Sequence, residues 1–379
     1  MDAASFIARR LRFKGSMAKV SIAVSFLVMI MAVSISAGFR KEIRRGVSSY
    51  SGDIQITNSS MNYLGEEDPM PSSPDFFDAV ASVKGVRSLV PAVYRAGIIK
   101  SGEDIQGVLF KGVPTSDSVS LQVSVPDRLA RVLNLSEGDE LLTYFVGEKV
   151  KARKFTVKSI YRNLVDTDET LLIYSNIRDL QRLNGWDEDE VSALEVTLDE
   201  KYESPPAIAD RQALIGAYAY GYVAKSMVQK YPQLFDWLNL LDFNVMVILI
   251  LMTVVAGFNM ISGLLILLFR SISTIGILKS MGMTDRSIGA VFLKLSSNLV
   301  LKGMAWGNGI AFVLCIIQSL THVVKLNPAN YFVPFVPVAL NVPMVLLADA
   351  VAYVVIMLLL LLPAMFISKV DPAQTVRAQ

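Results

Sequence analysis

The chain has 379 residues, of which 53% are hydrophobic and only 18% are charged, and its mean hydropathy is +0.45. This balance excludes an ordinary soluble globular protein, in which about a quarter of the residues are charged, and it excludes an intrinsically disordered one. The net charge of +2 gives no indication of nucleic-acid binding, which rests on concentrated positive charge. The single cysteine, Cys315, and the single histidine, His322, argue against a disulfide framework, a zinc site and a Ser-His-Asp triad.

Four apolar stretches are long enough to cross a bilayer, since a transmembrane helix needs about 20 mostly apolar residues. They predict transmembrane helices at residues 20–39, 243–269, 295–320 and 343–367. The first stretch follows a basic N-terminal segment, so a cleaved signal peptide is the alternative. Its apolar run exceeds the roughly 7–15 residues of a signal core, which favours a retained helix.

Lysine and arginine residues in the short connections predict the orientation of these helices. They are frequent at residues 1–19 and 270–294, whereas the 321–342 loop contains Lys325 alone. A basic cluster at residues 40–45 argues for the opposite orientation, but long segments translocate largely regardless of charge. We therefore expect residues 1–19, the 270–294 loop and the 368–379 tail in the cytoplasm, and residues 40–242 and the 321–342 loop outside.

Residues 40–242 have the composition of a folded domain and are long enough to form one. Apolar alternation predicts strands, and capping and breaker residues predict short helices between them. The expected strands are 52–57, 86–93, 96–100, 105–113, 154–161, 170–174 and 192–198, and the expected helices are 75–83, 129–133 and 175–183. After a break at Pro205-Pro206, helical segments are expected from 213 to 230 and onward to Trp237. The predicted fold is thus a membrane protein with four transmembrane α-helices and a large α+β extracytoplasmic domain inserted between helices 1 and 2.

Motifs for catalysis are absent from the sequence. It contains no G-x-x-x-x-G-K-[ST], no G-x-S-x-G and no H-E-x-x-H. The acidic clusters at 66–68 and 187–190 lie beside turn-forming residues, so solvated loops explain them better than a cation site. We expect no catalytic residue and no metal site on this chain.

Two features within the apolar stretches stand out. Gly303 and Gly307 form a G-x-x-x-G pattern, which favours close helix packing. Asp349 is an intramembrane carboxylate, which by default suggests a functional site, although it lies only six residues after Pro343 and thus near the predicted outer interface.

The segment at residues 258–288 is the most informative. An apolar helix leaves the bilayer at Arg270, a short amphipathic stretch follows and ends at Gly282, and Thr284 with Asp285 begins the next helix. A short cytoplasmic helix at this place would suit the docking of a soluble motor protein. A plain connecting loop fits the same pattern.

This segment, FNMISGLLILLFRSISTIGILKSMGMTDRSI, resembles the second helix and the cytoplasmic coupling helix of the FtsX/MacB-type ABC permeases, and within them the Lol-type lipoprotein-releasing permeases. The resemblance extends over nearly the whole chain. In order, it includes FIARRLRFK (6–14), AGFRKEIR (37–44), GDIQIT (52–57), the stretches 83–114 and 129–196, NPANYFVPFVPVALN (327–341) and DPAQTVRA (371–378).

The resemblance implies a type VII ABC permease in the bacterial inner membrane. Such a subunit is not an enzyme and carries no cofactor, because ATP and Mg²⁺ bind to two separate ABC ATP-binding subunits. It pairs with a second permease, a paralogue or another copy of itself. Closure of the ATPase dimer pushes on the coupling helix, and helices 1 and 2 carry the motion to the outer domain. In Lol-type systems the acyl chains of a lipoprotein substrate enter between the permeases from the membrane lipid, and the lipoprotein passes to a periplasmic carrier. Two alternatives stay open: a mechanotransmitting MacB-like export permease, and an FtsX-like regulator of cell-wall hydrolases, whose outer domain is usually smaller.

The candidate site residues follow from this reading. The family usually has an acidic residue before the IGILK run, where this sequence has Thr274. The resemblance implies ATPase coupling through Ile275, Gly276, Ile277, Leu278, Lys279, Met281 and Gly282. Flexible apolar side chains of the first two helices are candidates for lipid or lipoprotein binding, with ordinary packing as the alternative; they are Phe26, Met29, Val33, Met252, Phe258 and Met260.

Overall fold

The computed structural model describes residues 16–64, 68–101, 104–115, 120–147, 150–162, 171–202 and 204–365. The chain divides into two compact units. The helical unit comprises residues 1–41, 237–325 and 335–379, and the α+β unit comprises residues 42–236 and 326–334. The predicted amphipathic N-terminus up to residue 15 and the predicted tail at 368–379 lie outside the described residues.

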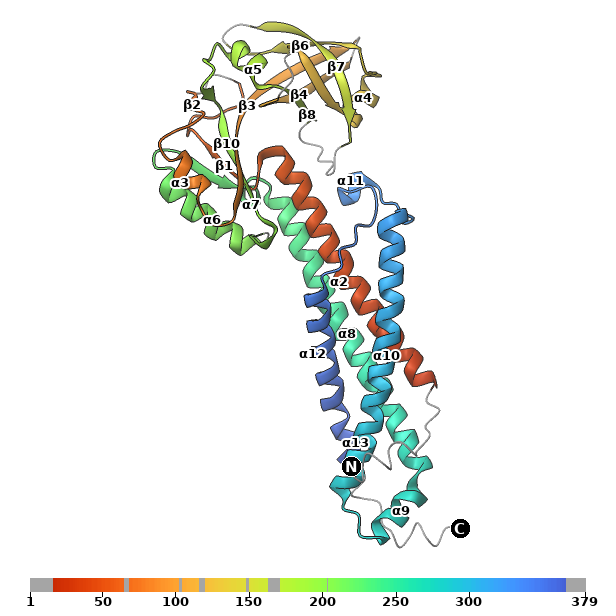
Figure 1. Cartoon of the computed structure of the whole chain (residues 1–379). Coiled ribbons are helices and arrows are strands. Elements are labelled where there is room, and N and C mark those ends of the chain that lie inside the picture. Colours follow the sequence, from red (N-terminus) through yellow and green to blue (C-terminus); the bar gives the residue numbers. More distant parts are fainter. Residues whose placement is uncertain are drawn as a thin grey trace. The chain divides into compact units, whose positions relative to one another are not determined.

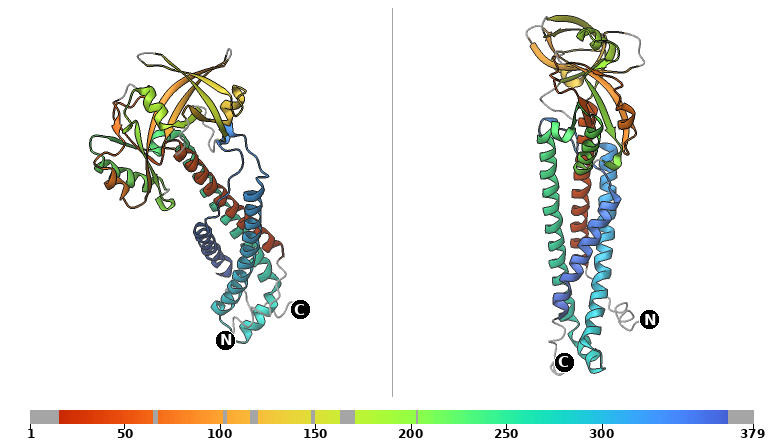
Figure 2. Two further views of the ribbon diagram at one scale, coloured as in Figure 1. Left: turned by 45° about the horizontal axis from the view of Figure 1, so that its top comes forward. Right: turned by 90° about the vertical axis from the view of Figure 1, so that its left-hand side faces the viewer.

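Long helices build the helical unit, and they run side by side in Figures 1 and 2. They are α2 (Ser16–Ser51), α8 (Pro232–Arg270), α10 (Asp285–Thr321) and α12 (Val342–Leu359). The short helix α9 (Ile272–Ser280) lies between α8 and α10, and the short helix α13 (Leu361–Met365) follows α12. Among the described residues, four helical segments are long and apolar enough to cross a membrane: 17–51, 232–270, 285–321 and 342–363. The last ten residues of α2 and the first five of α8 belong to the α+β unit.

Three of these helices continue beyond the apolar stretches that predict them. Hydropathy indicates only the part of a helix that suits the hydrocarbon core, whereas the hydrogen bonds of the helix backbone continue through polar residues. In α2 the helix continues to Ser51. Gly52 follows its last residue with a φ of +70°, which suits a glycine after a helix C-terminus. The predicted fourth helix is instead interrupted at Leu360. Pro363 has no main-chain N–H to donate to the carbonyl oxygen of Leu359, so the helical hydrogen bond between these two residues is absent.

An apolar core holds the helices of the helical unit together. It is formed by buried side chains of all four long helices, among them Phe26, Met260, Phe292 and Ile356. The G-x-x-x-G pattern has the predicted packing role. A Cβ atom on Gly303 would lie 2.7 Å from Cγ2 of Ile22 on α2, and one on Gly307 would overlap the carbonyl oxygen of Ala23.

The α+β unit is built on one large sheet. Its strands are β1 (Ile54–Thr57), β3 (Val86–Ser101), β4 (Asp104–Val113), β5 (Gln122–Pro126), β6 (Glu140–Phe145), β7 (Lys151–Tyr161), β8 (Leu171–Asn176), β10 (Ala193–Leu198) and β11 (Val223–Ser226), and β2 (Met70–Pro71) pairs separately with β9 (Glu190–Val191). Its helices are α3 (Phe77–Ala81), α4 (Asp127–Val132), α5 (Ile177–Asn184), η1 (Glu200–Tyr202), α6 (Pro205–Tyr218), α7 (Met227–Lys230) and α11 (Pro328–Tyr331).

Part of the sheet closes on itself. The strand order is β11-β1-β10-β3-β4-β8-β5-β7-β6, and β6 pairs with β3 as well as with β7. Strands β3, β4, β8, β5, β7 and β6 therefore form a small barrel, whose interior must be filled by side chains. Phe110, Phe145 and Phe155 fill it, with ring centroids 5.0–6.1 Å apart.

Two sequence expectations for this unit are wrong. The strands expected at 86–93 and 96–100 are one continuous strand, β3, in which the polar Tyr94 and Arg95 are buried. The helical segments expected from 213 to 230 are interrupted by a strand, because α6 is followed by β11 and then α7, with Gly221 at a φ of +88° before the strand. The two prolines occupy the first positions of α6, where a missing N–H costs nothing.

Candidate functional site

Helix α9 packs one face on the core of the helical unit, so the predicted coupling segment is a helix and not a plain loop. Ile275 and Gly276 are buried, and Leu278 is half-buried against the same core as Phe292 of α10. These side chains fix α9 to the bundle and are not available to a partner.

The opposite face of α9 is exposed and partly apolar. Ile277 is 53% exposed and Met281, just after the helix, is 79% exposed. Ser273, Thr274 and Ser280 are exposed on the same side, because these positions fall on one face at about 100° per residue. Two large apolar side chains bordered by small hydroxyl residues match the apolar centre and polar rim of a protein interface.

The turn after α9 fixes its direction relative to α10. Lys279 forms an ion pair of 2.8 Å with Asp285, and Gly282 has a φ of +89°, which glycine tolerates. Thr284 caps α10 by accepting a hydrogen bond from the main-chain N–H of Ser287 at 3.3 Å. Lys279 is thus occupied in holding this turn.

The structure therefore separates the predicted coupling residues by exposure. Ile277, Met281 and Gly282 are exposed, whereas the others are buried, half-buried or paired within the chain. The sequence-based prediction left out Ser273 and Ser280, and it named Thr274 only as the position where the family usually has an acidic residue. The helical period could have indicated them, because they share a face with Ile277.

The six candidate lipid-binding residues do not form one surface. Phe26, Met29, Val33 and Met260 are at most 2% exposed and pack between helices. Met252 is partly buried, and Phe258 is 64% exposed. The four buried side chains also take part in helix packing, and acyl contact stays a prediction for all six residues.

Asp349 joins two helices of the bundle. It is 5% exposed, and its Oδ2 accepts a hydrogen bond of 2.6 Å from Nδ2 of Asn308 on α10. A second carboxylate, Asp242 of α8, accepts a hydrogen bond of 2.6 Å from Ser36 of α2 and forms an ion pair with Arg40. Both aspartates therefore connect neighbouring helices of the unit.

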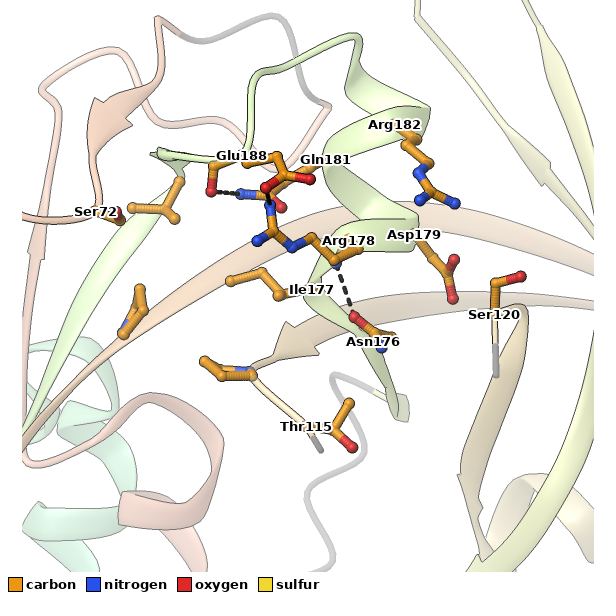
Figure 3. A pocket seen from close by; sticks show the side chains of 13 residues that line it. Ser72, Thr115, Ser120, Asn176, Ile177, Arg178, Asp179, Gln181, Arg182 and Glu188 are labelled. Carbon is orange, nitrogen blue, oxygen red and sulfur yellow. Dashed lines mark hydrogen bonds and ion pairs between the residues drawn. The ribbon is translucent and has the colours of Figure 1, made fainter. Parts of the chain in front are cut away.

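A pocket of about 550 Å³ lies in the α+β unit beside α5 (Figure 3). Arg178 and Glu188 on its wall form an ion pair of 2.6 Å, and Oδ2 of Asp179 accepts a hydrogen bond from the main-chain N–H of Leu121 at 2.7 Å. The acidic run at 187–190 thus takes part in pairing within the domain. Among the described residues, no group of three or more His, Cys, Asp or Glu side chains is placed to hold a metal ion.

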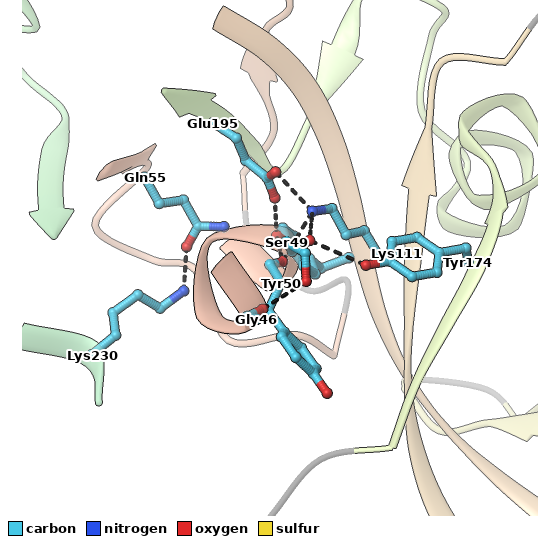
Figure 4. A network of polar contacts seen from close by, with 9 residues as sticks. Gly46, Ser49, Tyr50, Gln55, Lys111, Tyr174, Glu195 and Lys230 are labelled. Atoms are coloured by element: carbon cyan, nitrogen blue, oxygen red, sulfur yellow. Dashed lines mark hydrogen bonds and ion pairs between the residues drawn. The ribbon is translucent and has the colours of Figure 1, made fainter. Parts of the chain in front are cut away.

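Among the described lysines and arginines of the α+β unit, Lys230 has the most clearly perturbed pKa. Its Nζ donates to Oε1 of Gln55 at 2.5 Å (Figure 4). Burial lowers its pKa from 10.5 to about 8, with help from the charges of Lys111 and Lys225 and against that of Glu195. Between pH 8 and pH 10.5 the unfolded chain binds more protons at this site than the folded one, so the stability contributed by the site rises with pH.

We expect the free energy of unfolding of the wild type to rise by roughly 3 kcal/mol, relative to Lys230→Met, between pH 7 and pH 10.5. Urea unfolding of the full chain in detergent measures this difference through the fluorescence of Trp186, with the other two tryptophans, Trp237 and Trp306, changed to phenylalanine. Tyrosine ionisation affects both proteins equally and cancels. Lys201→Met, at an exposed position, should keep the rise. Parallel curves for the wild type and Lys230→Met would contradict the assignment.

Comparison with known proteins gives the following likenesses. Residues 246–372 match the family model described as FtsX-like permease C-terminal. The chain is 21% identical over 392 residues to the lipoprotein-releasing system transmembrane protein LolC of Xylella fastidiosa (strain 9a5c), an alignment that covers 96% of this chain and 93% of that protein. It is 20% identical over 394 residues to the lipoprotein-releasing system transmembrane protein LolE of Haemophilus influenzae, with 94% and 92% covered.

Among solved structures, the periplasmic region of MacB from Actinobacillus actinomycetemcomitans aligns with 51% of this chain and 95% of that one, at 14% identity and a TM-score of 0.32. The family model covers α8 from residue 246 onward and the helices α9 to α13, and the two relatives cover nearly the full length. The resemblance to the FtsX/MacB-type permeases, and within them to the Lol-type transmembrane subunits, is therefore confirmed.

Proposed function

We propose that this chain is the permease subunit of an ABC transporter that extracts lipoproteins from the inner membrane and passes them to a periplasmic carrier. The observation that carries the proposal is the likeness to lipoprotein-releasing transmembrane proteins over almost the whole chain. The exposed apolar face of α9 supports it, because a separate ATP-binding subunit would need such a surface to dock on.

In this proposal α2, α8, α10 and α12 span the membrane, with both chain termini and α9 in the cytoplasm. The α+β unit, inserted between the first and second spans, lies on the periplasmic side. Two ATP-binding subunits hold the ATP and Mg²⁺ and dock on α9 and its counterpart in a second permease. Their closure displaces α9, and α2 and α8 carry the displacement to the α+β unit.

Depletion of the protein tests this function. Inner and outer membranes are separated while the cells still grow, and triacylated lipoproteins are followed in each. We expect lipoproteins to accumulate in the inner membrane, and expression of the wild-type chain to restore their sorting. Normal sorting would contradict lipoprotein release; combined with altered export it would favour a MacB-like role, and with altered cell-wall cleavage an FtsX-like one.

A further inference from the structure

A buried lysine attaches the last turn of α2 to the sheet of the α+β unit. Lys111 on β4 is only 3% exposed. Its Nζ donates to the main-chain oxygens of Ser49 at 3.1 Å and Tyr50 at 3.0 Å, and to Oε2 of Glu195 at 2.7 Å (Figure 4). An ammonium group has three protons, so these contacts use all of them.

The two carbonyls belong to a helix end, where the last C=O groups have no partner within the helix. Each receives a second donor from the sheet. The hydroxyl of Tyr174 donates to the oxygen of Ser49 at 3.1 Å, and that of Tyr94 donates to the oxygen of Tyr50 at 2.9 Å and also contacts Oε1 of Glu195. The charge of Lys111 further suits the negative end of the helix dipole.

The side chains that hold α2 come from adjacent strands. Tyr94 of β3 pairs directly with Lys111 of β4, and Lys111 pairs with Tyr174 of β8, so the three form one row across the sheet. Glu195 lies on β10, the neighbour of β3 on the other side. Burial raises the pKa of Tyr174 to about 12, so its hydroxyl keeps the proton that it donates. We call Tyr94, Lys111, Tyr174 and Glu195 the Lys111 cluster.

We propose that the Lys111 cluster is the joint through which displacement of α2 moves the sheet, and that Lys111 and Tyr174 are positioning residues of the transport cycle. The inference rests on the proposed function, in which motion reaches the α+β unit through α2. The contacts are buried and partly charge-assisted, which makes them strong. A displacement of the last turn of α2 therefore acts on β10, β3, β4 and β8 together.

Two tyrosine variants separate a joint from a purely structural contact. Tyr174→Phe removes the bond to the last turn of α2. Tyr161→Phe removes a bond of the same kind, from the hydroxyl to the main-chain oxygen of Leu172 at 2.6 Å, which does not involve α2. The rings of the two tyrosines are neighbours, 5.1 Å apart between centroids, so the variants change the same region of the unit.

Each variant is reconstituted in proteoliposomes with its partner permease and ATPase, and release of a triacylated lipoprotein to the carrier is measured per ATP hydrolysed. A hydrogen bond of ordinary strength corresponds to roughly a fivefold change in an equilibrium constant. We expect Tyr174→Phe to lower release per ATP about fivefold while ATP hydrolysis continues, and Tyr161→Phe to leave the ratio unchanged. Lys111→Met should lower it further.

Equal release per ATP in the two tyrosine variants would overturn the inference. If the wild type itself releases no lipoprotein, the proposed function fails. The role of the Lys111 cluster as a joint is then tested by amide hydrogen exchange. In the same complexes, trapping the ATPase with ADP-vanadate should change exchange in β8 of the wild type and of Tyr161→Phe. The change should be smaller in Tyr174→Phe, in which Lys111 and Tyr94 still hold the last turn of α2. A change of wild-type size in Tyr174→Phe, or no change in the wild type, would also overturn the inference.

Discussion

Replacing Ile277 by aspartate is expected to abolish association with the ATP-binding subunit. Ile277 lies at the centre of the exposed face of α9, between Thr274 and Met281. A charge there would be desolvated in any interface that covers the face. Loss of a central apolar contact typically costs about 2 kcal/mol or more, which is roughly a 30-fold loss of affinity. Co-purification with the ATPase, and the ATP hydrolysis of the complex, measure the effect.

The matched control is Ile105→Asp on β4 of the α+β unit. Ile105 is also exposed, at 64%, so both substitutions place the same charge at an exposed isoleucine. We expect Ile105→Asp to co-purify with the ATPase as the wild type does. Ile277 is a sharper choice than Gly276 or Leu278, because those two are needed for packing and their variants would not separate docking from folding. Normal association of Ile277→Asp would refute docking at this face.

The second large effect is expected for Gly307→Val in the helical unit. A side chain at this position would overlap the main-chain oxygen of Ala23 and press on Cβ of Phe26, so α10 would have to move away from α2. Forced separation of packed backbones costs more than ordinary overpacking, and we expect a loss of at least about 3 kcal/mol of stability. Thermal unfolding in detergent measures it as a large fall in midpoint.

Gly309→Val provides the comparison, because it makes the same change on the same helix. A Cβ atom on Gly309 would meet nothing within 4 Å. The Gly309→Val variant should therefore unfold close to the wild-type temperature. Similar losses in both variants would mean that helix propensity, and not the contact with α2, determines the effect.

Sequence patterns predicted the elements whose signals are local. The four apolar runs and the caps at Thr284 and Gly282 depend on neighbours within a few residues, and the structure has helices and a turn at these places. Which face of α9 is buried depends on Phe292 and other distant residues of the core. The sequence therefore predicted a short helical segment here but did not separate Ile277 from its buried neighbours.

Long-range contacts account for most of what the sequence did not reveal. A lysine in a strand is ordinarily expected at the surface. Lys111 is buried because Glu195, 84 positions away, and the end of α2 meet it. Phe26 and Met29 illustrate a different ambiguity, since flexible apolar side chains look the same in a lipid groove and in a packed bundle.

The pairing of β1 has a consequence for biosynthesis. Within the described residues, β1 pairs with β10 and β11, which are completed at Leu198 and Ser226. During synthesis the strand that follows α2 must therefore wait for almost the entire unit to emerge, and loop closure over such distances slows folding. The exposed backbone of Ile54–Thr57 is then open to wrong partners, which makes this interval the stage at which a chaperone would matter most.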